Sequence, residues 1–130
     1  MFSLAGLAIL KLLSWDDSIE RRGKDAADPF VIIKNYIAAG NMDRFFEEAD
    51  ILKEEGSDYD RSSARFLGRE MARIAGQATK AKLAGILERE AASSQGRQIA
   101  MDVWRRDTFQ NESYEQIVVY FNALLRGLLD

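Results

Sequence analysis

The sequence predicts an all-α protein, a single compact bundle of about six to seven helices in one domain over residues 1–130. Apolar residues recur at steps of three and four along most of the chain, which is the spacing of one helix face. No segment alternates apolar and polar residues convincingly enough to pair as a strand. The composition, 47% apolar and 30% charged, is that of an ordinary globular domain large enough for one core.

The first predicted helix covers residues 3–15, with Ser3 as its candidate N-cap. It is apolar on nearly every side, because only Ser3, Lys11 and Ser14 are polar. A surface helix of a monomer shows one polar face. Either the rest of the domain therefore surrounds this helix, or a second chain covers part of it. The lone charge of Lys11 either extends to the surface or faces a site.

The second predicted helix covers residues 25–39. Pro29 sits near its start, where the missing N–H costs least, and Gly40 is the expected stop. Its inward face contains Phe30, Ile33 and Ile37.

A third helix is expected over residues 42–55, from a cap at Asn41 to a stop at Gly56. Its inward residues are expected to be Met42, Phe45, Phe46, Ala49 and Leu52. Residues 57–60 form a turn that also supplies the N-cap of the fourth helix, residues 61–75, which Gly76 ends. The apolar stripe of the fourth helix is Ala64, Leu67, Met71 and Ile74.

Three further segments complete the prediction. A fifth helix, residues 78–92, buries Leu83, Ile86 and Leu87, and a sixth, residues 97–106, contains Ile99, Val103 and Trp104. The last helix, residues 112–129, begins after Asn111. Its stripe, the best amphipathic pattern in the chain, is Tyr114, Ile117, Val118, Phe121, Leu124, Leu125 and Leu128. Residues 117–121 are β-branched and aromatic, but a strand there would have no partner, so a helix is favoured.

The composition excludes several kinds of chemistry. With no His and no Cys, the chain has no zinc site built on these residues, no His general base, no Cys nucleophile and no disulfide. The net charge of −3 is unlike that of a nucleic-acid-binding domain. The apolar start lacks a basic region and a cleavage site and is too short to span a bilayer, so we expect no membrane span. The absence of Cys fits the cytoplasmic location that we expect.

Two clusters of charged residues are candidate sites. In the first, Lys24, Asp25 and Asp28 fall within five residues, and a helix places both carboxylates on one face. Paired carboxylates can bind Mg²⁺ or act as a general base. Acidic residues in a first turn also simply favour the helix dipole, so the spacing alone does not choose between the two interpretations. No metal-ligand cluster of known spacing is present.

In the second cluster, Arg61, Arg65, Arg69 and Arg73 recur at steps of four and form one ridge on the fourth predicted helix. The planar guanidinium donates two hydrogen bonds at once, which suits nucleotide or RNA phosphate or an acidic partner. The alternative is pairing within the chain, with the acidic residues of the third predicted helix or with Glu70.

Taken in order, several segments resemble a known family. Residues 3–15 are followed by Arg21-Arg22-Gly23-Lys24-Asp25-Ala26-Ala27-Asp28, then by Asp58-Tyr59-Asp60 and by Ala64-Arg65-Phe66-Leu67-Gly68-Arg69-Glu70. This order is similar to the C-terminal part of predicted bacterial nucleotidyltransferases of the AbiEii-like toxin group, known from toxin–antitoxin systems. The resemblance extends over most of the chain.

The resemblance implies that a nucleotidyltransferase-fold domain, with a Gly-Ser turn and metal-binding carboxylates, comes before the helical region. It matches Lys11 to the helical Lys of the family, and Lys24, Asp25 and Asp28 to a Lys-Asp-x-x-Asp-like element. The Gly-Ser turn and its carboxylates have no counterpart here, so the chain corresponds to the helical portion. The resemblance therefore implies no cofactor in this chain, and Mg²⁺ only where a catalytic domain is present.

These observations predict a helical accessory domain that packs against a nucleotidyltransferase-type catalytic domain and helps to hold nucleotide or RNA. Lys11, Lys24, Asp25 and Asp28 would line the shared cleft, and the arginine ridge would face phosphate or the partner. We do not expect this chain alone to be catalytic. The alternative is a stand-alone protein-interaction module that forms a homodimer through the first helix.

Overall fold

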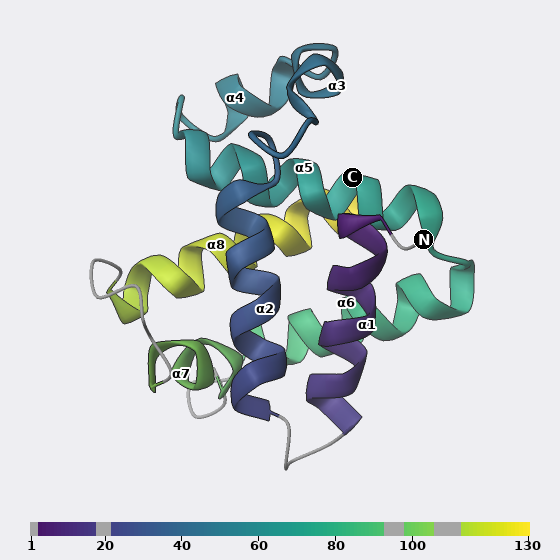
Figure 1. The fold of residues 1–130 in the computed structure, drawn as a ribbon, viewed down its shortest axis with the longest axis vertical. Coiled ribbons are helices and arrows are strands. Elements are labelled where there is room, and N and C mark those ends of the chain that lie inside the picture. The colour runs from purple at the N-terminus through teal and green to yellow at the C-terminus, as the bar shows by residue number, and fades with distance from the viewer. Residues whose placement is uncertain (1–2, 18–21, 93–97, 106–112) are drawn as a thin grey trace.

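The computed structural model describes residues 3–17, 22–92, 98–105 and 113–130. Within these ranges the chain is helical and contains no strand (Figure 1). The helices are α1 (Leu4–Asp17), α2 (Arg22–Asn35), α3 (Met42–Phe46), α4 (Asp50–Glu54), α5 (Tyr59–Ile74), α6 (Gln77–Ala92), α7 (Gln98–Arg105) and α8 (Tyr114–Leu129). The prediction of an all-α fold, and of a helix over residues 117–121, is confirmed. The described residues form eight helices because residues 42–55 make two short helices instead of one.

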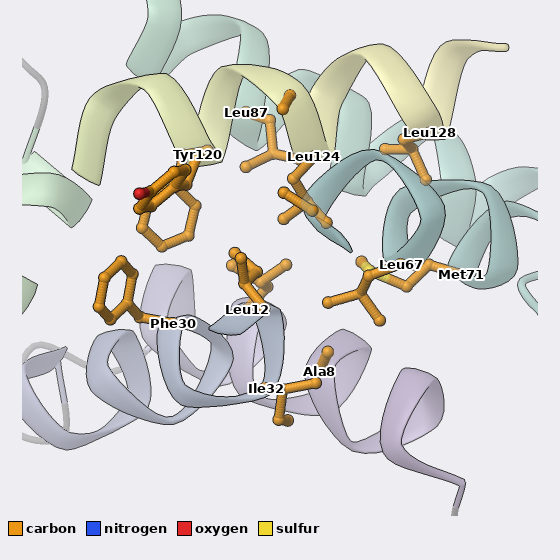
Figure 2. Close-up of a cluster of buried hydrophobic side chains, with 14 of the residues drawn as sticks. Ala8, Leu12, Phe30, Ile32, Leu67, Met71, Leu87, Tyr120, Leu124 and Leu128 are labelled. Carbon is orange, nitrogen blue, oxygen red and sulfur yellow. The ribbon is translucent and has the colours of Figure 1, made fainter. Parts of the chain in front are cut away.

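One apolar core receives buried side chains from all eight helices, and those labelled in Figure 2 come from α1, α2, α5, α6 and α8. α1 and α2 lie side by side and face α5, α6 and α8 across it, while α7 packs on α2 and α8. The side chains that meet in the core include Ala8, Leu12, Phe30, Leu67, Met71, Leu87, Tyr120 and Leu124. The core therefore fixes how α1, α2 and α5, which carry the candidate residues, sit relative to one another.

The most extensive helix contact joins α5 and α8, and it depends on small residues. Ala64 and Gly68 are four residues apart on α5, as Ala123 and Gly127 are on α8, and all four are buried. A Cβ added at Gly127 would overlap with the carbonyl oxygen of Arg65, and one at Gly68 would overlap with the backbone of α8. The two helix backbones are therefore in direct contact at this crossing.

Short polar side chains begin three helices, as their sequence positions require. The Oγ of Ser3 accepts the Gly6 N–H at 3.1 Å at the start of α1, and the Asp58 carboxylate accepts the Arg61 N–H at 2.9 Å at the start of α5. α8 begins at Tyr114 with Ser113 as its N-cap, while Asn111 lies outside the described residues. Gly40 and Gly56 have φ of +88° and +66°, the left-handed conformation that glycine adopts readily. Gly56 follows α4 as expected, but α2 runs from Arg22 to Asn35 and not over residues 25–39, so it ends five residues before Gly40.

The prediction for residues 42–55 was wrong in two respects. The helix breaks after Phe46, where backbone bonds from Glu47 and Glu48 reach back only three residues. As a result the expected stripe does not continue, and Met42 and Phe46 are 43% and 64% exposed. Phe45 is buried and Leu52 is partly buried, as predicted, whereas Ala49 is exposed and the fully buried residue of α4 is Ile51, which the stripe did not include.

The expected side-chain cap from Asn41 is also absent from α3. The Asn41 amide instead donates to the Tyr36 carbonyl at 2.6 Å and accepts from Arg44. The first bond ties Asn41 to the turn after α2, and the second joins it to a side chain of α3, so neither satisfies a backbone N–H at the start of α3.

Several apolar residues are more exposed than the stripes predicted. Ile74, at the end of α5, is 56% exposed, and Trp104 on α7 is 49% exposed. The buried side of α1 is Ala5, Ala8, Ile9, Leu12 and Trp15, while Leu4 and Leu10 are 37% and 44% exposed. The domain thus surrounds the first helix only in part. In the part of the chain that the structure describes, no helix has both the length and the apolar character to cross a membrane.

Candidate functional sites

The first candidate site lies where α1 and α2 run side by side. The Lys11 ammonium is 3.1 Å from a carboxylate oxygen of Asp28, and the two side chains are 26% and 35% exposed. The structure therefore brings together two of the four residues that the resemblance assigned to one cleft. The lone charge in the apolar first helix does not simply extend into solvent, because it has a partner on the next helix.

Lys24 and Asp25 lie on the same helix as Asp28, one turn before it. Their side chains are outside the part of the chain whose side chains are described. Within the described residues, no group of three or more carboxylates is placed to hold a metal ion.

The second candidate site, the arginine ridge, lies on α5 as predicted, and most of its charge is met within the chain. Arg65 contacts Glu54, Glu55 and Asp130 at 2.8–3.1 Å. Glu55 is only 2% exposed and also accepts from Arg126 at 2.5 and 3.0 Å. Burial alone would raise the pKa of Glu55, but its bonds from Arg126 and Arg65 outweigh burial and hold the pKa below its usual range.

The Arg61 end of the ridge is also occupied. Its Nη2 donates to the Glu55 carbonyl at 2.5 Å, and its Nε lies 3.7 Å from the Glu55 carboxylate. Arg61 and Arg65 therefore serve to close the loop before α5 and to neutralise the buried carboxylate of Glu55.

At the other end of the ridge, Arg69 and Arg73 hold the α3–α4 segment (residues 42–54) against α5. Arg69 contacts Glu48, Asp50 and Asp130 at 2.7–3.1 Å, and Arg73 contacts Glu48 at 2.6 Å and Glu70 at 3.2 Å. Hydrogen bonds from Arg73 and Arg69 lower the pKa of Glu48, and a bond from Arg69 lowers the pKa of Asp50. The sequence left two partners open for the ridge, and the structure supplies the intramolecular one.

Besides forming these ion pairs, Arg69 and Arg73 line a pocket. The pocket, of about 430 Å³, opens between the end of α5, the start of α6 and the end of α8. It is lined by Arg69, Ala72, Arg73, Lys80, Gly127 and Asp130. Ala72 contributes only a methyl group to this lining. Three cations and one carboxylate line it, so the lining is positive.

Lys80 is the functional candidate that sequence reasoning missed. It is one lysine on an otherwise ordinary helix, and nothing near it in sequence marks it out. Lys80 and Arg73 are seven residues apart, with a helix break at Gly76 between them. The sequence therefore does not indicate that both line one pocket. The break itself was predicted, but the direction of α6 after it was not.

No protein-family model, curated protein or solved structure matches this chain.

Proposed function

We propose that this chain is a helical accessory domain that holds a phosphate-bearing substrate for a nucleotidyltransferase-type catalytic domain. The observation that supports the proposal best is the Lys11–Asp28 pair, since α1 and α2 bring together two residues that the resemblance places in one cleft. A lysine ammonium has three donors for phosphate oxygens. A partly exposed ion pair gains little from being closed, so a phosphate can displace the carboxylate at small cost.

The surroundings of the pair fit a surface that another domain covers. Leu4 and Leu10 are exposed on the same helix as Lys11, and Val31 is 36% exposed one turn after Asp28. Apolar side chains beside a polar site are typical of a substrate cleft formed between two domains. In this arrangement Lys11 would bind phosphate, Asp28 would orient Lys11, and the apolar residues would contact the catalytic domain.

The test is a titration of the full chain with nucleoside triphosphates, followed by the backbone amide NMR signals. We expect shifts in α1 and α2, and we expect Lys11→Met to remove them. The matched control is Lys34→Met, because Lys34 forms a similar pair with Asp60, at 3.0 Å and with side chains 24% and 34% exposed. Absence of shifts in α1 and α2, or their equal loss in both variants, would contradict the proposal.

Activity gives a second readout. We expect the isolated chain to transfer no label from labelled nucleoside triphosphates, since phosphoryl transfer needs metal held at the phosphates. Mg²⁺-dependent labelling of an acceptor that Asp25→Asn and Asp28→Asn abolish would show that the chain is catalytic by itself.

A second candidate function is a homodimeric interaction module. The observation that favours it is the exposure of Leu4 and Leu10 on α1, which a second copy of the helix would bury. Sedimentation equilibrium distinguishes the two functions, because only the second requires the chain to form a dimer.

A further inference from the structure

We infer that the pocket lined by Arg69, Arg73 and Lys80 binds a small molecule with a terminal phosphate, at a site separate from the Lys11–Asp28 pair. The pocket lies between α5, α6 and α8, whereas the pair lies between α1 and α2. A volume of about 430 Å³ exceeds that of a lone phosphate and falls within the range of small-molecule sites.

The hydrogen-bond donors that remain unused point to an oxyanion. Arg73 gives Nη1 to Glu48 and Glu70 and one Nη2 hydrogen to Glu48, which leaves its Nε–H and its second Nη2 hydrogen. Lys80 makes no ion pair or hydrogen bond through its ammonium with any residue that the structure describes, so three more donors remain. These donors match the several acceptor oxygens of a terminal phosphate.

The electrostatic setting favours an anion at Lys80 in particular. The charge of Arg69 is met by Glu48, Asp50 and Asp130, and the charge of Arg73 by Glu48 and Glu70. The positive charge of Lys80 is the one left over, and it lies in the first turn of α6, which contains no acidic residue.

Asp130, the carboxylate that lines the pocket, is compatible with the binding of a phosphate there. Asp130 accepts from Arg65 at 2.8 and 2.9 Å and from Arg69 at 2.7 Å, and the bonds from Arg65 and Arg69 hold its pKa below the usual range. Its charge is therefore offset by two arginines. These three bonds leave about one of its four acceptor positions, which suits a hydroxyl group of the ligand.

The lining also sets the class of ligand. Among the described residues that line the pocket none is aromatic, so a nucleobase would have no ring of these to stack on. Along the ridge toward Arg65, a polymer backbone would meet Glu48, Asp50 and Glu54, which repel phosphodiesters. A phosphate ester of a small polyhydroxylated molecule fits better than RNA or a base-recognised nucleotide.

The test uses ribose 5-phosphate as the probe, with ribose and a 5′-hydroxyl RNA oligomer for comparison, measured by calorimetric titration of the full chain. We expect ribose 5-phosphate to bind and ribose and the RNA oligomer to bind weakly or not at all. Lys80→Ala should weaken the binding roughly tenfold, which is the effect of losing one charge-assisted contact. Lys82→Ala is the matched control, because Lys82 is exposed on the same helix outside the pocket.

A direct readout comes from the Nε–H signal of Arg73, which should shift when the probe binds. Absence of binding, or binding that Lys80→Ala and Lys82→Ala change equally, would overturn the inference. RNA that binds as tightly as the probe and depends on Lys80 would overturn the ligand class. Since Lys11→Met tests the other site, either site can fail while the other holds.

Discussion

The N-cap residues of this chain show how far the role of a single side chain can be predicted from the sequence. Ser3 was predicted as a cap, and the turn of residues 57–60 was predicted to supply another. Ser3 and Asp58 each accept a backbone N–H three residues ahead. Asn41 was predicted by the same rule and does not cap, because its amide finds the Tyr36 carbonyl and Arg44 instead. A cap depends on competing partners, and those partners are known only once the chain has folded.

The phenol of Tyr36 is a further case in which surroundings decide a residue's chemistry. Burial, followed by the nearby Glu70 carboxylate, raises the pKa of Tyr36 to about 12. Its hydroxyl lies 3.3 Å from Glu70, to which it donates. The phenol of Tyr36 therefore remains neutral and able to donate its hydrogen bond at neutral pH.

The two glycines at positions 85 and 127 allow a matched prediction about stability. Gly127→Ala should destabilise the fold by about 1–3 kcal/mol or more, because the added methyl group overlaps with the Arg65 backbone and forces α5 and α8 apart. Gly85→Ala should stabilise the fold by about 0.5–1 kcal/mol, since it lies within α6 with nothing within 4 Å of the added carbon.

Urea unfolding of both variants measures these two changes. A pair of free-energy changes with the same sign would show that the direct backbone contact of α5 and α8 does not limit the packing there.

At the scale of elements, the long stripes were read correctly and the short ones were not. α8 has the predicted apolar face over four turns, so an error at one position does not change the assignment. α3 and α4 have five residues each, fewer than two turns, and a single break redirects their side chains. The paired small residues of α5 and α8, at spacing four on both helices, were a usable signal of close packing that the apolar stripes concealed.

The α3–α4 segment allows a prediction about pH. The pKa values of Glu48 and Asp50 are lowered by bonds from Arg73 and Arg69, so their ion pairs contribute stability that is complete above the ordinary carboxylate pKa. That contribution is lost as the pH falls through the lowered folded-state values. Below about pH 4, amide hydrogen exchange should therefore increase in residues 42–54 before it increases in α5 and α8.

A variant pair separates this cause from general acid unfolding. Glu48→Gln should reproduce the faster exchange at neutral pH, at a local cost of about 1 kcal/mol. Asp43→Asn should not, because Asp43 is exposed on α3 and forms no ion pair with the residues that the structure describes. If exchange in residues 42–54 is unchanged by Glu48→Gln, apolar contacts of Phe45 and Ile51 hold the segment instead.

For the whole molecule, the fold class followed from periodicity, but the candidate sites depend on which helices come together. Lys11 and Asp28 could be connected through the resemblance, whereas geometry alone gave no reason to pair residues 17 positions apart. The Arg73–Lys80 pocket was beyond prediction because it depends on the path of three helices. Pairing of the ridge with acidic residues was one of two open alternatives, and choosing between them required the placement of Glu48, Asp50 and Asp130.

The oligomeric state is a property of the whole molecule that α1 makes testable. Burying an exposed leucine stabilises by roughly 1.5–3 kcal/mol, so Leu4 and Leu10 of two chains can offset part of the cost of association. If the homodimer is the function, sedimentation equilibrium should give a dimer for the wild type and a monomer for Leu10→Glu. Val119→Glu, which changes an apolar side chain 36% exposed on α8, should stay dimeric. A wild type that remains monomeric at high concentration removes this candidate.

The contrast between how α3–α4 and the remaining helices are held has a consequence for thermodynamic measurements. α3–α4 is held to α5 largely by arginine–carboxylate contacts, with only Phe45 and Ile51 buried. The remaining helices are held mainly by the burial of apolar side chains. Concentrated salt weakens charge interactions and leaves apolar burial intact or strengthens it. In high salt the chain should therefore lose its single cooperative transition, and the calorimetric enthalpy should exceed the van't Hoff enthalpy. A midpoint temperature recorded there would describe α1, α2 and α5–α8, after α3–α4 had separated from α5.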